Sequence, residues 1–270
     1  MIRILLVVLV LVCMLLLGCQ SSLIYFPRKY TESELLLVNA RGGTLLSYKT
    51  NQGSQTAFYL PPKSQGNETK LPKQIWVCFC GNGSTALDWM SYNYKWNETA
   101  GWLLVDYPGY GLCEGHPTPE RIQDNARESL SLLAKHFKIT EKELHPHLAV
   151  LGHSLGAAAA LRTAAEHKIT RAVVVSPFTS MTDMGKLRIG WPLCYLNHHL
   201  FDNRKSLDAL EEIKAKVIMF HGQNDDSIPV TMSRELAKAH PNIVTLKEMP
   251  NMGHNDILEL ASKDIANAIR

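Results

Sequence analysis

Short, continuous runs of apolar residues alternate with amphipathic stretches from residue 74 to the end of the sequence. The runs are QIWVCFC (74–80), GWLLVDY (101–107), HLAVLGH (147–153), RAVVVSP (171–177) and KVIMFHG (216–222), and VTLKEMP (244–250) is expected to be a last strand. Continuous apolar runs are typical of strands that are buried on both faces, and the stretches between them are typical of helices. The pattern therefore predicts an α/β fold, a mostly parallel twisted sheet with helices on both faces.

Local signals indicate where some of the helices lie. Thr118 precedes Pro119, which combines an N-cap residue with a proline at the first helical position. Another helical stretch is expected near residues 86–96. LGAAAALRTAAEH (155–167) is rich in alanine, the residue with the highest helix propensity. All three stretches lie between apolar runs, where a parallel sheet needs its crossover helices.

Two further segments extend the pattern. Ahead of the alternation, LLLVNARGGTLLSYK (35–49) and QTAFYLPP (55–62) predict two strands around a Gly-Gly turn. Residues 178–214 are a longer excursion between two strands, and we expect them to form a small cap over one end of the sheet. Because no internal repeat or second boundary interrupts the pattern, residues 35–270 are expected to form one domain.

The N-terminal segment has a different composition. Arg3 is followed by an apolar run over residues 4–17, which is short for a membrane-spanning helix and typical of the hydrophobic part of a secretory signal. The run closes on LLGC (16–19), which resembles the lipobox of bacterial lipoproteins. In that family the signal is cleaved before the cysteine, and the thiol and the new amino group carry acyl chains.

The lipobox resemblance implies a signal peptide over residues 1–18, then a lipidated Cys19 and a tether that together span residues 19–34. Gln20 after the cysteine implies sorting to the outer membrane of a Gram-negative cell. The protein would then be lipid-anchored in the bacterial cell envelope, on the periplasmic side. An uncleaved signal anchor is the alternative interpretation. In both cases the folded part is expected outside the cytoplasm and attached to a membrane.

The net charge and the positions of the cysteines limit which binding partners and which disulfide bonds can be expected. The chain of 270 residues has a formal net charge of +3 and no basic run, so no nucleic-acid partner is expected. Cys78 and Cys80 alternate on one strand, which predicts that they share a face but makes them poor partners for a disulfide. For Cys113 and Cys194, a disulfide and buried free thiols remain alternatives.

The sequence GHSLG (152–156) lies between the apolar run HLAVLGH and the alanine-rich helix. Gly-x-Ser-x-Gly between a strand and a helix is the signature of a nucleophile elbow, a sharp turn that exposes a serine hydroxyl. Side chains at Gly152 and Gly156 are expected to collide with the neighbouring strand or helix. The N–H groups of the first helical turn also favour negative charge beside the serine. Ser154 is therefore the candidate nucleophile.

A serine nucleophile needs a base, and the base needs a carboxylate that orients it. In a parallel sheet both should follow the carboxyl ends of other strands. Asp225 and Asp226 follow the run KVIMFHG, and His254 follows the expected last strand. The order serine, aspartate, histidine along the chain is the order that folds with a nucleophile elbow use.

With these motifs the chain resembles the α/β hydrolases over residues 25–270. HGQNDDSIP (221–229) resembles the family's His-Gly-x-x-Asp-x-x-Val-Pro segment. Its spacing assigns the catalytic acid to Asp225, with Asp226 as the alternative. DYPGYGLCEG (106–115) resembles the loop that follows the preceding strand in the family, where Asp106 is expected to be architectural. The resemblance implies the α/β-hydrolase fold.

FCGNGST (79–85) resembles the His-Gly-Asn-Gly/Ala segment of membrane-associated serine hydrolases, a group that includes protein depalmitoylases. Cys80 stands in place of the family's histidine. The fold supplies one oxyanion donor from the N–H of the residue after the nucleophile, here Leu155. The second donor is expected to be the N–H of Asn82, with Gly83 as the alternative.

The resemblance implies a serine esterase or thioesterase that acts on an acyl substrate, lipid-like or palmitate-type, without a cofactor or a metal. A serine peptidase, and a catalytically silent envelope lipoprotein that binds a partner, remain alternatives. Ser154 at the elbow excludes haloalkane- and epoxide-type hydrolases, which need an aspartate there. Cys194, His198 and His199 lie close together in the sequence but lack the fourth ligand of a zinc site.

Overall fold

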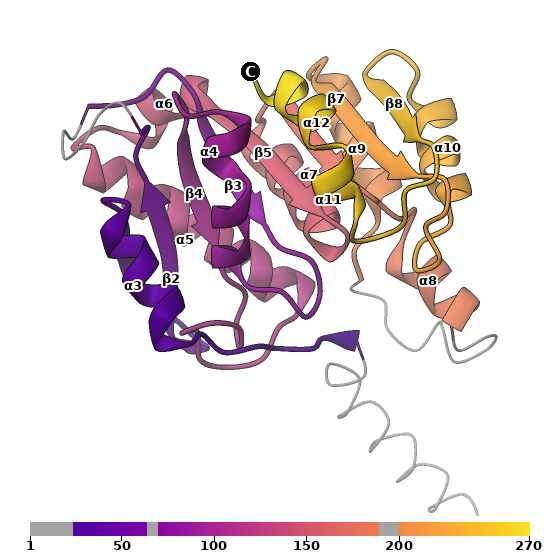
Figure 1. Cartoon of the computed structure of the whole chain (residues 1–270). Coiled ribbons are helices and arrows are strands. Elements are labelled where there is room, and N and C mark those ends of the chain that lie inside the picture. Colours follow the sequence, from indigo (N-terminus) through magenta and orange to yellow (C-terminus); the bar gives the residue numbers. More distant parts are fainter. Residues whose placement is uncertain (1–23, 64–69, 189–199) are drawn as a thin grey trace, which may run out of the picture.

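The structure, a computed structural model, describes residues 24–63, 70–188 and 200–270. They contain an eight-stranded sheet with the order β1-β2-β4-β3-β5-β6-β7-β8 and helices on both faces (Figure 1). β1 and β2 form an antiparallel hairpin, and β2 is also antiparallel to β4. The pairs from β4 to β8 are all parallel. The predicted mostly parallel α/β fold is confirmed.

The strands follow the apolar runs of the sequence closely. They are β1 (Thr44–Thr50), β2 (Gly53–Leu60), β3 (Ile75–Phe79), β4 (Gly101–Val105), β5 (Leu148–His153), β6 (Arg171–Val175), β7 (Lys216–Gly222) and β8 (Val244–Met249). Every residue of β3, β4 and β5 is buried, because helices cover both faces of these central strands. The last residue of β3 pairs with Gly152 near the end of β5, so the loops after both strands leave the sheet at the same edge.

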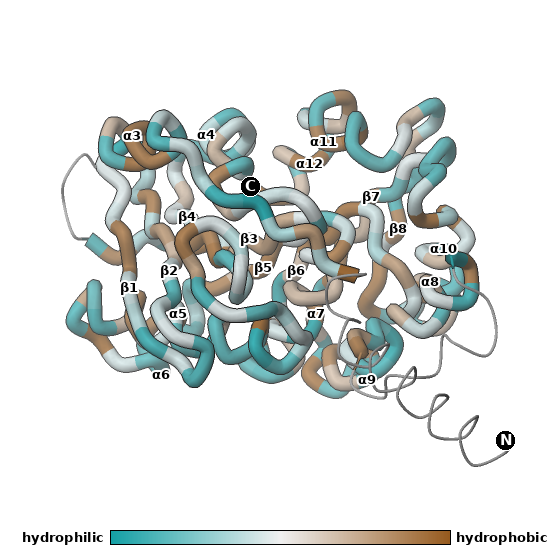
Figure 2. Tube along the Cα trace, turned by 90° about the horizontal axis from the view of Figure 1, so that it is seen from below, coloured by the Kyte–Doolittle hydropathy of each residue, from teal (hydrophilic) through white to brown (hydrophobic). Residues whose placement is uncertain are grey.

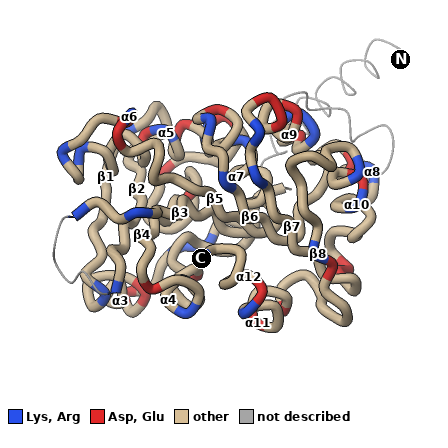
Figure 3. The backbone as a smooth tube through the Cα atoms, turned by 90° about the horizontal axis from the view of Figure 1, so that it is seen from above, with Lys and Arg blue, Asp and Glu red and all other residues tan. Residues whose placement is uncertain are grey.

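Two helical layers cover the sheet, and Figure 2 shows them on opposite sides of it. One layer holds α5 (Pro119–His136), α7 (Leu155–His167), α9 (Asn203–Glu212) and α10 (Val230–Ala239). The other holds α3 (Glu32–Ala40), η1 (Ala86–Ser91), α4 (Asn93–Trp96), α11 (Ile257–Leu260) and α12 (Ser262–Ile269). Short α6 (Glu141–Leu144) and η2 (His145–His147) precede β5, and α8 (Met181–Arg188) follows β6. Charged residues lie mainly on these outer helices, and the central strands carry none (Figure 3).

The helix signals in the sequence give the observed helix boundaries. The hydroxyl of Thr118 accepts a hydrogen bond from the N–H of Arg121, and Pro119 is the first residue of α5. The alanine-rich stretch forms α7 over the whole predicted range. The small side chains of α7 allow it to pack closely against β3, β5 and β6, the strands that surround the Gly-x-Ser-x-Gly turn.

The prediction of a strand over residues 35–40 was wrong, because these residues belong to α3. Thr31 and Glu34 form a capping box, in which each side chain accepts a hydrogen bond from the backbone N–H of the other residue. Such a box fixes the first turn of a helix and outweighs the strand-like run Leu-Leu-Leu-Val that follows it. The Gly-Gly turn then leads into β1, as predicted.

The excursion after β6 contains two helices that lie in different places. α9 packs against α7 and so belongs to a layer of the sheet, whereas α8 contacts the loop after β7, where Arg188 donates to the carbonyl of Ser227. Residues 189–199, which include Cys194, His198 and His199, lie outside the described residues. That residues 178–214 form a cap stays a prediction.

Cys78, Cys80 and Cys113 are buried free thiols, and Cys194 lies outside the described part of the chain. The prediction that Cys78 and Cys80 share a face was wrong. Cys80 follows the last residue of β3, and the two side chains pack into clusters on opposite faces of the sheet. Among the residues from 24 onward that are described, no helix has both the length and the apolar character needed to cross a bilayer.

Candidate active site

Ser154 lies between the end of β5 and the start of α7, in a backbone conformation that is unfavourable for any residue except glycine. Its φ is 58° and its ψ is −119°. The turn is held by the N–H of Ser154, which donates to the carbonyl of Val175 at 2.9 Å, and by its carbonyl, which accepts from the N–H of Ala157 at 3.0 Å. Strain of this kind is retained where a side chain must be presented in one direction.

The two glycines of the turn have no room for a side chain. A Cβ atom at Gly152 would overlap the carbonyl group of Gly156. A Cβ atom at Gly156 would overlap the carbonyl of Phe79 and lie 2.6 Å from the carbonyl oxygen of Cys80. The predicted collisions are confirmed, and they show that the start of α7 is pressed against the end of β3.

The structure brings Ser154, His254 and Asp225 into one hydrogen-bonded series. His254 follows β8, and its Nε2 lies 3.0 Å from Ser154 Oγ. Its Nδ1 lies 2.7 Å from Asp225 Oδ2 in the loop after β7. With Nδ1–H donating to the carboxylate, Nε2 has a free lone pair that accepts the serine hydroxyl proton. Three residues far apart in the sequence thus have the geometry of a nucleophile, a base and an orienting acid.

Asp225, not Asp226, occupies the position of the acid. The Asp225 side chain is fully buried, and its Oδ1 accepts the N–H groups of Ser227 and Ile228 at 2.9 and 2.7 Å. Burial raises the pKa of Asp225, but the hydrogen bonds from His221, His254 and Ile228 outweigh it and hold the pKa well below its usual range. The carboxylate of Asp225 is therefore ionised near neutral pH. Asp226 is exposed.

His221 is a neighbour of the site that the sequence motif contained without a defined role. Its Nε2 lies 2.8 Å from the carbonyl of Ile228 and 3.3 Å from Asp225 Oδ2, and its Nδ1 lies 2.6 Å from Ser233 Oγ. The ring is completely buried at the end of β7. His221 therefore fixes the loop that carries Asp225, and the spacing of four residues between the two was the only signal for it in the sequence.

His153, the residue before the candidate nucleophile, supports the candidate base. Its Nε2 donates to the backbone carbonyl of His254 at 2.9 Å, and the two rings lie 4.9 Å apart between centroids. Burial and the proximity of His254 lower the pKa of His153 to about 4, so the ring is neutral near pH 7. His153 thus acts as an uncharged donor that fixes the backbone of the loop after β8.

The candidate oxyanion donors lie on two loops that meet beside Ser154. The N–H of Leu155 belongs to the first turn of α7, and Asn82 lies in the loop after β3. A Cβ atom at Gly81 would lie 3.6 Å from Ser154 Cβ, which brings this loop next to the nucleophile. Neither the Leu155 N–H nor the Asn82 N–H donates to another described residue. Gly83, the alternative, makes a backbone hydrogen bond to the hydroxyl of Tyr110.

Asp106 has a structural role near this loop. It is fully buried, and its carboxylate accepts the hydroxyl of Tyr30 at 2.5 Å and the N–H of Ala86 at 3.0 Å. Burial raises the pKa of Asp106 to about 6 against the opposing effect of these hydrogen bonds. Its carboxylate joins the loop after β3 to the N-terminal segment and does not contact the candidate triad, as expected for an architectural residue.

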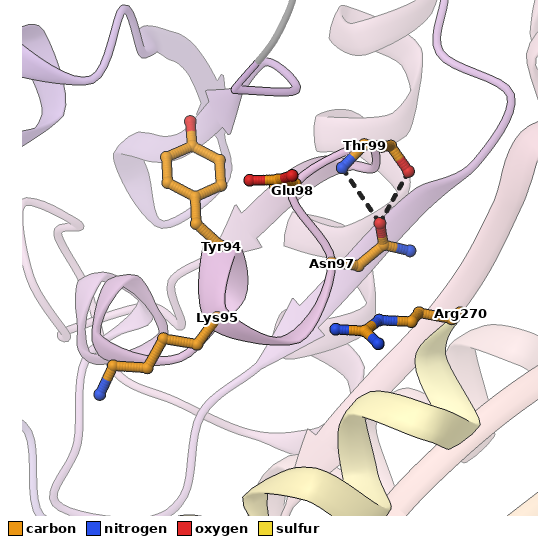
Figure 4. A pocket seen from close by; sticks show the side chains of 6 residues that line it. All are labelled: Tyr94, Lys95, Asn97, Glu98, Thr99 and Arg270. Atoms are coloured by element: carbon orange, nitrogen blue, oxygen red, sulfur yellow. Dashed lines mark hydrogen bonds between the residues drawn. The ribbon is translucent and has the colours of Figure 1, made fainter.

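An open pocket of about 470 Å³ lies far from these residues (Figure 4). It is lined by Tyr94, Lys95, Asn97, Glu98, Thr99 and Arg270. These residues precede β4 or end the chain, so the pocket opens at the edge where the strands begin, whereas Ser154 lies where they end. The described residues contain no cluster of metal-ligating side chains. Cys19, the predicted lipidation site, lies outside the described residues.

Comparisons with known proteins agree with the fold of the chain. Residues 76–204 match the model of the Alpha/beta hydrolase family. Uncharacterized proteins of two Mycobacterium tuberculosis strains are each 32% identical over 170 residues, 62% of this chain and 58% of the relative. The match therefore spans little more than half of the length of those relatives. A putative alpha/beta hydrolase of Acanthamoeba polyphaga mimivirus is 26% identical over 87% of this chain and 84% of its own.

Solved structures share the fold at lower identity. An alpha-beta hydrolase from Vibrio vulnificus has a TM-score of 0.67 at 20% identity, covering 89% of this chain and 88% of the other. An esterase of Pyrococcus furiosus has a TM-score of 0.64 at 16% identity, covering 90% and 96%. Est1E from Butyrivibrio proteoclasticus, with ferulic acid bound, has a TM-score of 0.63 at 16% identity, covering 82% and 96%. By its sheet order, its Gly-x-Ser-x-Gly turn and these matches, the chain has the α/β-hydrolase fold.

Proposed function

We propose that this protein is a serine hydrolase that cleaves carboxylic ester or thioester bonds through an acyl-enzyme intermediate. The proposal is carried by the hydrogen-bonded series from Ser154 Oγ through the ring of His254 to Asp225, with distances of 3.0 and 2.7 Å. A turn that only connected a strand to a helix would need neither the strained backbone of the serine nor a buried, ionised carboxylate behind the histidine.

In the proposed reaction, His254 Nε2 takes the proton of Ser154 as Oγ attacks the carbonyl carbon of the substrate. The N–H groups of Leu155 and Asn82 stabilise the negative charge on the carbonyl oxygen. When the tetrahedral intermediate collapses, the bond to the leaving alcohol or thiol breaks, and His254 gives the leaving group its proton. A water molecule then loses a proton to His254 and attacks the acyl-enzyme. The acid is released and Ser154 regains its hydroxyl proton.

Structural neighbours support an ester as the bond that is cleaved. The Pyrococcus furiosus neighbour is an esterase, and Est1E was solved with ferulic acid, a small aromatic acid, bound. A small acyl ester is therefore the first substrate class to test. A longer acyl chain, of the palmitate type, follows from the likeness of CGNG (80–83) to the loop of membrane-associated hydrolases.

We also propose that the enzyme works at a membrane, with a lipid on Cys19. The support is the LLGC sequence after an apolar run, together with the position of Ile24, whose carbonyl accepts a hydrogen bond from the Asn82 side chain in the loop beside Ser154. Metabolic labelling with an alkyne-bearing palmitate should modify the full-length chain in a bacterial host and should be lost in Cys19→Ser. Equal labelling of both would contradict lipidation at this residue.

A fluorophosphonate probe tests the hydrolase proposal before a substrate is known. We expect the probe to label Ser154, identified by peptide mass mapping, and we expect labelling to be lost in Ser154→Ala and strongly slowed in His254→Ala. The p-nitrophenyl esters of acetate, butyrate, octanoate and palmitate then give the preferred acyl length. Peptide p-nitroanilides separate an esterase from a peptidase. A folded protein without labelling and without ester hydrolysis would contradict the proposal and favour a binding lipoprotein.

A further inference from the structure

The residues before α3 form an ordered strap, defined here as residues 24–31. In Figure 1 this indigo segment runs along the lower edge of the molecule, toward which the arrowhead of β8 points. The side chain of Tyr25 is inserted into the core and is only 4% exposed. The carbonyl of Arg28 accepts the N–H of Gly111 at 2.8 Å, and the hydroxyl of Tyr30 donates to Asp106. The strap is therefore bound to the domain along its length.

The strap and Tyr110 together make hydrogen bonds with both polar atoms of the Asn82 side chain. Asn82 Oδ1 accepts the backbone N–H of Phe26 at 2.9 Å and the hydroxyl of Tyr110 at 2.7 Å. Asn82 Nδ2 donates to the carbonyl of Ile24 at 2.5 Å. An amide held at both ends in this way fixes the backbone to which it belongs. The Asn82 N–H is thereby held in one direction.

Tyr110 extends the same set of contacts to the next residue of the loop. Its Oη accepts a second contact from the N–H of Phe26 at 3.1 Å and a backbone hydrogen bond from Gly83. The N–H of Gly83 is thus engaged, whereas the N–H of Asn82 has no partner among the described residues. Tyr110 therefore engages the N–H of Gly83, and the N–H of Asn82 is left free of partners among the described residues.

The strap also makes hydrogen bonds with the end of the loop after β3 and with the first turn of η1. The guanidinium group of Arg28 donates to Thr85 Oγ1 and to Asp88 Oδ1, both at 2.7 Å. Asp88 in turn accepts the N–H of Thr85 at 2.9 Å. Residues 82–88 are therefore bonded to the strap at both ends, while Gly81 on the other side lies against Ser154.

We infer that the strap is a positioning element for the oxyanion hole, which holds the Asn82 N–H in the direction that stabilises the transition state. The inference rests on the hydrolase proposed above and adds a dependence of that activity on residues 24–31. An oxyanion donor acts only when it is already aimed at the developing charge, and a displacement of about 1 Å can cost on the order of 100-fold in rate. Ground-state binding of the ester depends much less on this donor.

The sharpest test is a pair of variants at Phe26. Phe26→Pro removes the N–H that donates to Asn82 and Tyr110, whereas Phe26→Ala keeps it and removes only a side chain that is 60% exposed. We expect Phe26→Pro to lower kcat for a p-nitrophenyl ester by about 10- to 100-fold with little change in KM. Phe26→Ala should keep the wild-type kcat within about twofold, since it retains every bond that positions the loop.

A tetrahedral inhibitor distinguishes positioning of the oxyanion donor from a general loss of structure. Ser154 Oγ adds to the carbonyl carbon of a trifluoromethyl ketone, and the former ketone oxygen of this adduct becomes an oxyanion. The affinity of the inhibitor should therefore fall in Phe26→Pro by about the same factor as kcat. Thermal unfolding and circular dichroism show whether the variant is folded. If Phe26→Pro is folded and retains the wild-type kcat and inhibitor affinity, the inference is overturned while the hydrolase proposal stands.

Tyr110→Phe gives a second test that leaves the strap backbone intact. It removes the hydroxyl that contacts Asn82, Phe26 and Gly83, and it should also lower kcat without raising KM. Tyr94→Phe is the matched control, because it removes a tyrosine hydroxyl bonded to the carbonyl of Pro61, and Tyr94 lines the pocket at the opposite edge of the sheet. An equal effect of the two substitutions would contradict a specific role. If the wild-type protein neither hydrolyses esters nor reacts with the fluorophosphonate, the hydrolase proposal itself fails.

Discussion

His153 donates a hydrogen bond from Nε2 to the backbone carbonyl of His254, at 2.9 Å. His153, the residue next to the candidate nucleophile, therefore holds the backbone of the candidate base, His254, although the two histidines are separated by 101 positions in the sequence. The ring that makes this bond is uncharged near pH 7, because a second proton on a buried ring beside His254 would be costly. The position of the base is thus linked to the protonation of a residue outside the triad.

This link makes stability depend on pH. The pKa of His153 is about 4 in the folded protein, against 6.5 for an ordinary histidine. Between these values the unfolded chain binds the proton and the folded chain does not, so stability falls as the pH decreases from 6.5 to 4. The contribution is about 3 kcal/mol when complete. Urea unfolding at pH 7.5 and pH 4.5 measures it. His153→Gln, which can still donate to the carbonyl, should show a smaller difference than the wild type, and an unchanged difference would refute the assignment.

The adjacent aspartates, Asp225 and Asp226, provide a matched pair of variants that tests the candidate catalytic acid. Asp225→Asn should lower kcat by about 10³- to 10⁴-fold, because an amide cannot hold His254 in the tautomer that accepts the serine proton. Asp226→Asn should leave kcat within about twofold, since an exposed carboxylate near the site adds only a screened charge. Steady-state kinetics on one p-nitrophenyl ester compares them. A large loss in Asp226→Asn, with Asp225→Asn active, would reverse the assignment.

The close contact between α7 and β3 predicts a steric effect at Gly156. In Gly156→Ala the new methyl group would overlap the carbonyl of Phe79, so backbone must shift, and we expect a loss of about 2–4 kcal/mol in the free energy of unfolding. Gly253→Ala is the control, because the nearest atom would lie at 3.4 Å, an ordinary contact. Urea denaturation of both variants gives the comparison. Similar stabilities would show that the packing at Gly156 is looser than described.

The capping box of α3 can be tested separately from the active site. Thr31→Ala removes the side-chain oxygen that accepts the N–H of Glu34, and it should lower the free energy of unfolding by about 1 kcal/mol. Thr31→Ser keeps a hydroxyl and should stay within a few tenths of a kcal/mol of the wild type. Thermal unfolding monitored by circular dichroism is sufficient. Equal losses in the two variants would mean that the methyl group, not the cap, is responsible.

The sheet and the candidate triad could be predicted because their signals are local. The strands from β3 to β7 are largely buried, and each leaves an apolar run in the sequence. The candidate catalytic residues follow β5, β7 and β8. Asp225 could be distinguished from Asp226 by spacing within one short motif. Such signals need no knowledge of which distant segments meet.

The features that sequence reasoning missed depend on contacts between distant segments. The strap was expected to be a tether, because nothing in residues 24–31 indicates that its backbone makes hydrogen bonds with the side chains of Asn82 and Tyr110. The contact of His153 with His254 is equally invisible, since it joins β5 to a loop that follows β8. The helix over residues 32–40 was missed for a different reason. Its capping box is a local signal, but a Leu-Leu-Leu-Val run before a Gly-Gly turn resembles a strand.

The position of Ile24, where the strap begins, limits how far the candidate active site can lie from a lipid on Cys19. Ile24 is bonded to the side chain of Asn82, beside the candidate catalytic serine, and only five peptide units separate it from Cys19. Even fully extended, that length of chain spans no more than about 18 Å. A lipid on Cys19 would therefore keep the catalytic edge within a short radius of the bilayer surface. Such an enzyme would encounter its substrates by lateral diffusion in two dimensions, and soluble esters in the bulk would compete poorly with those that share its membrane.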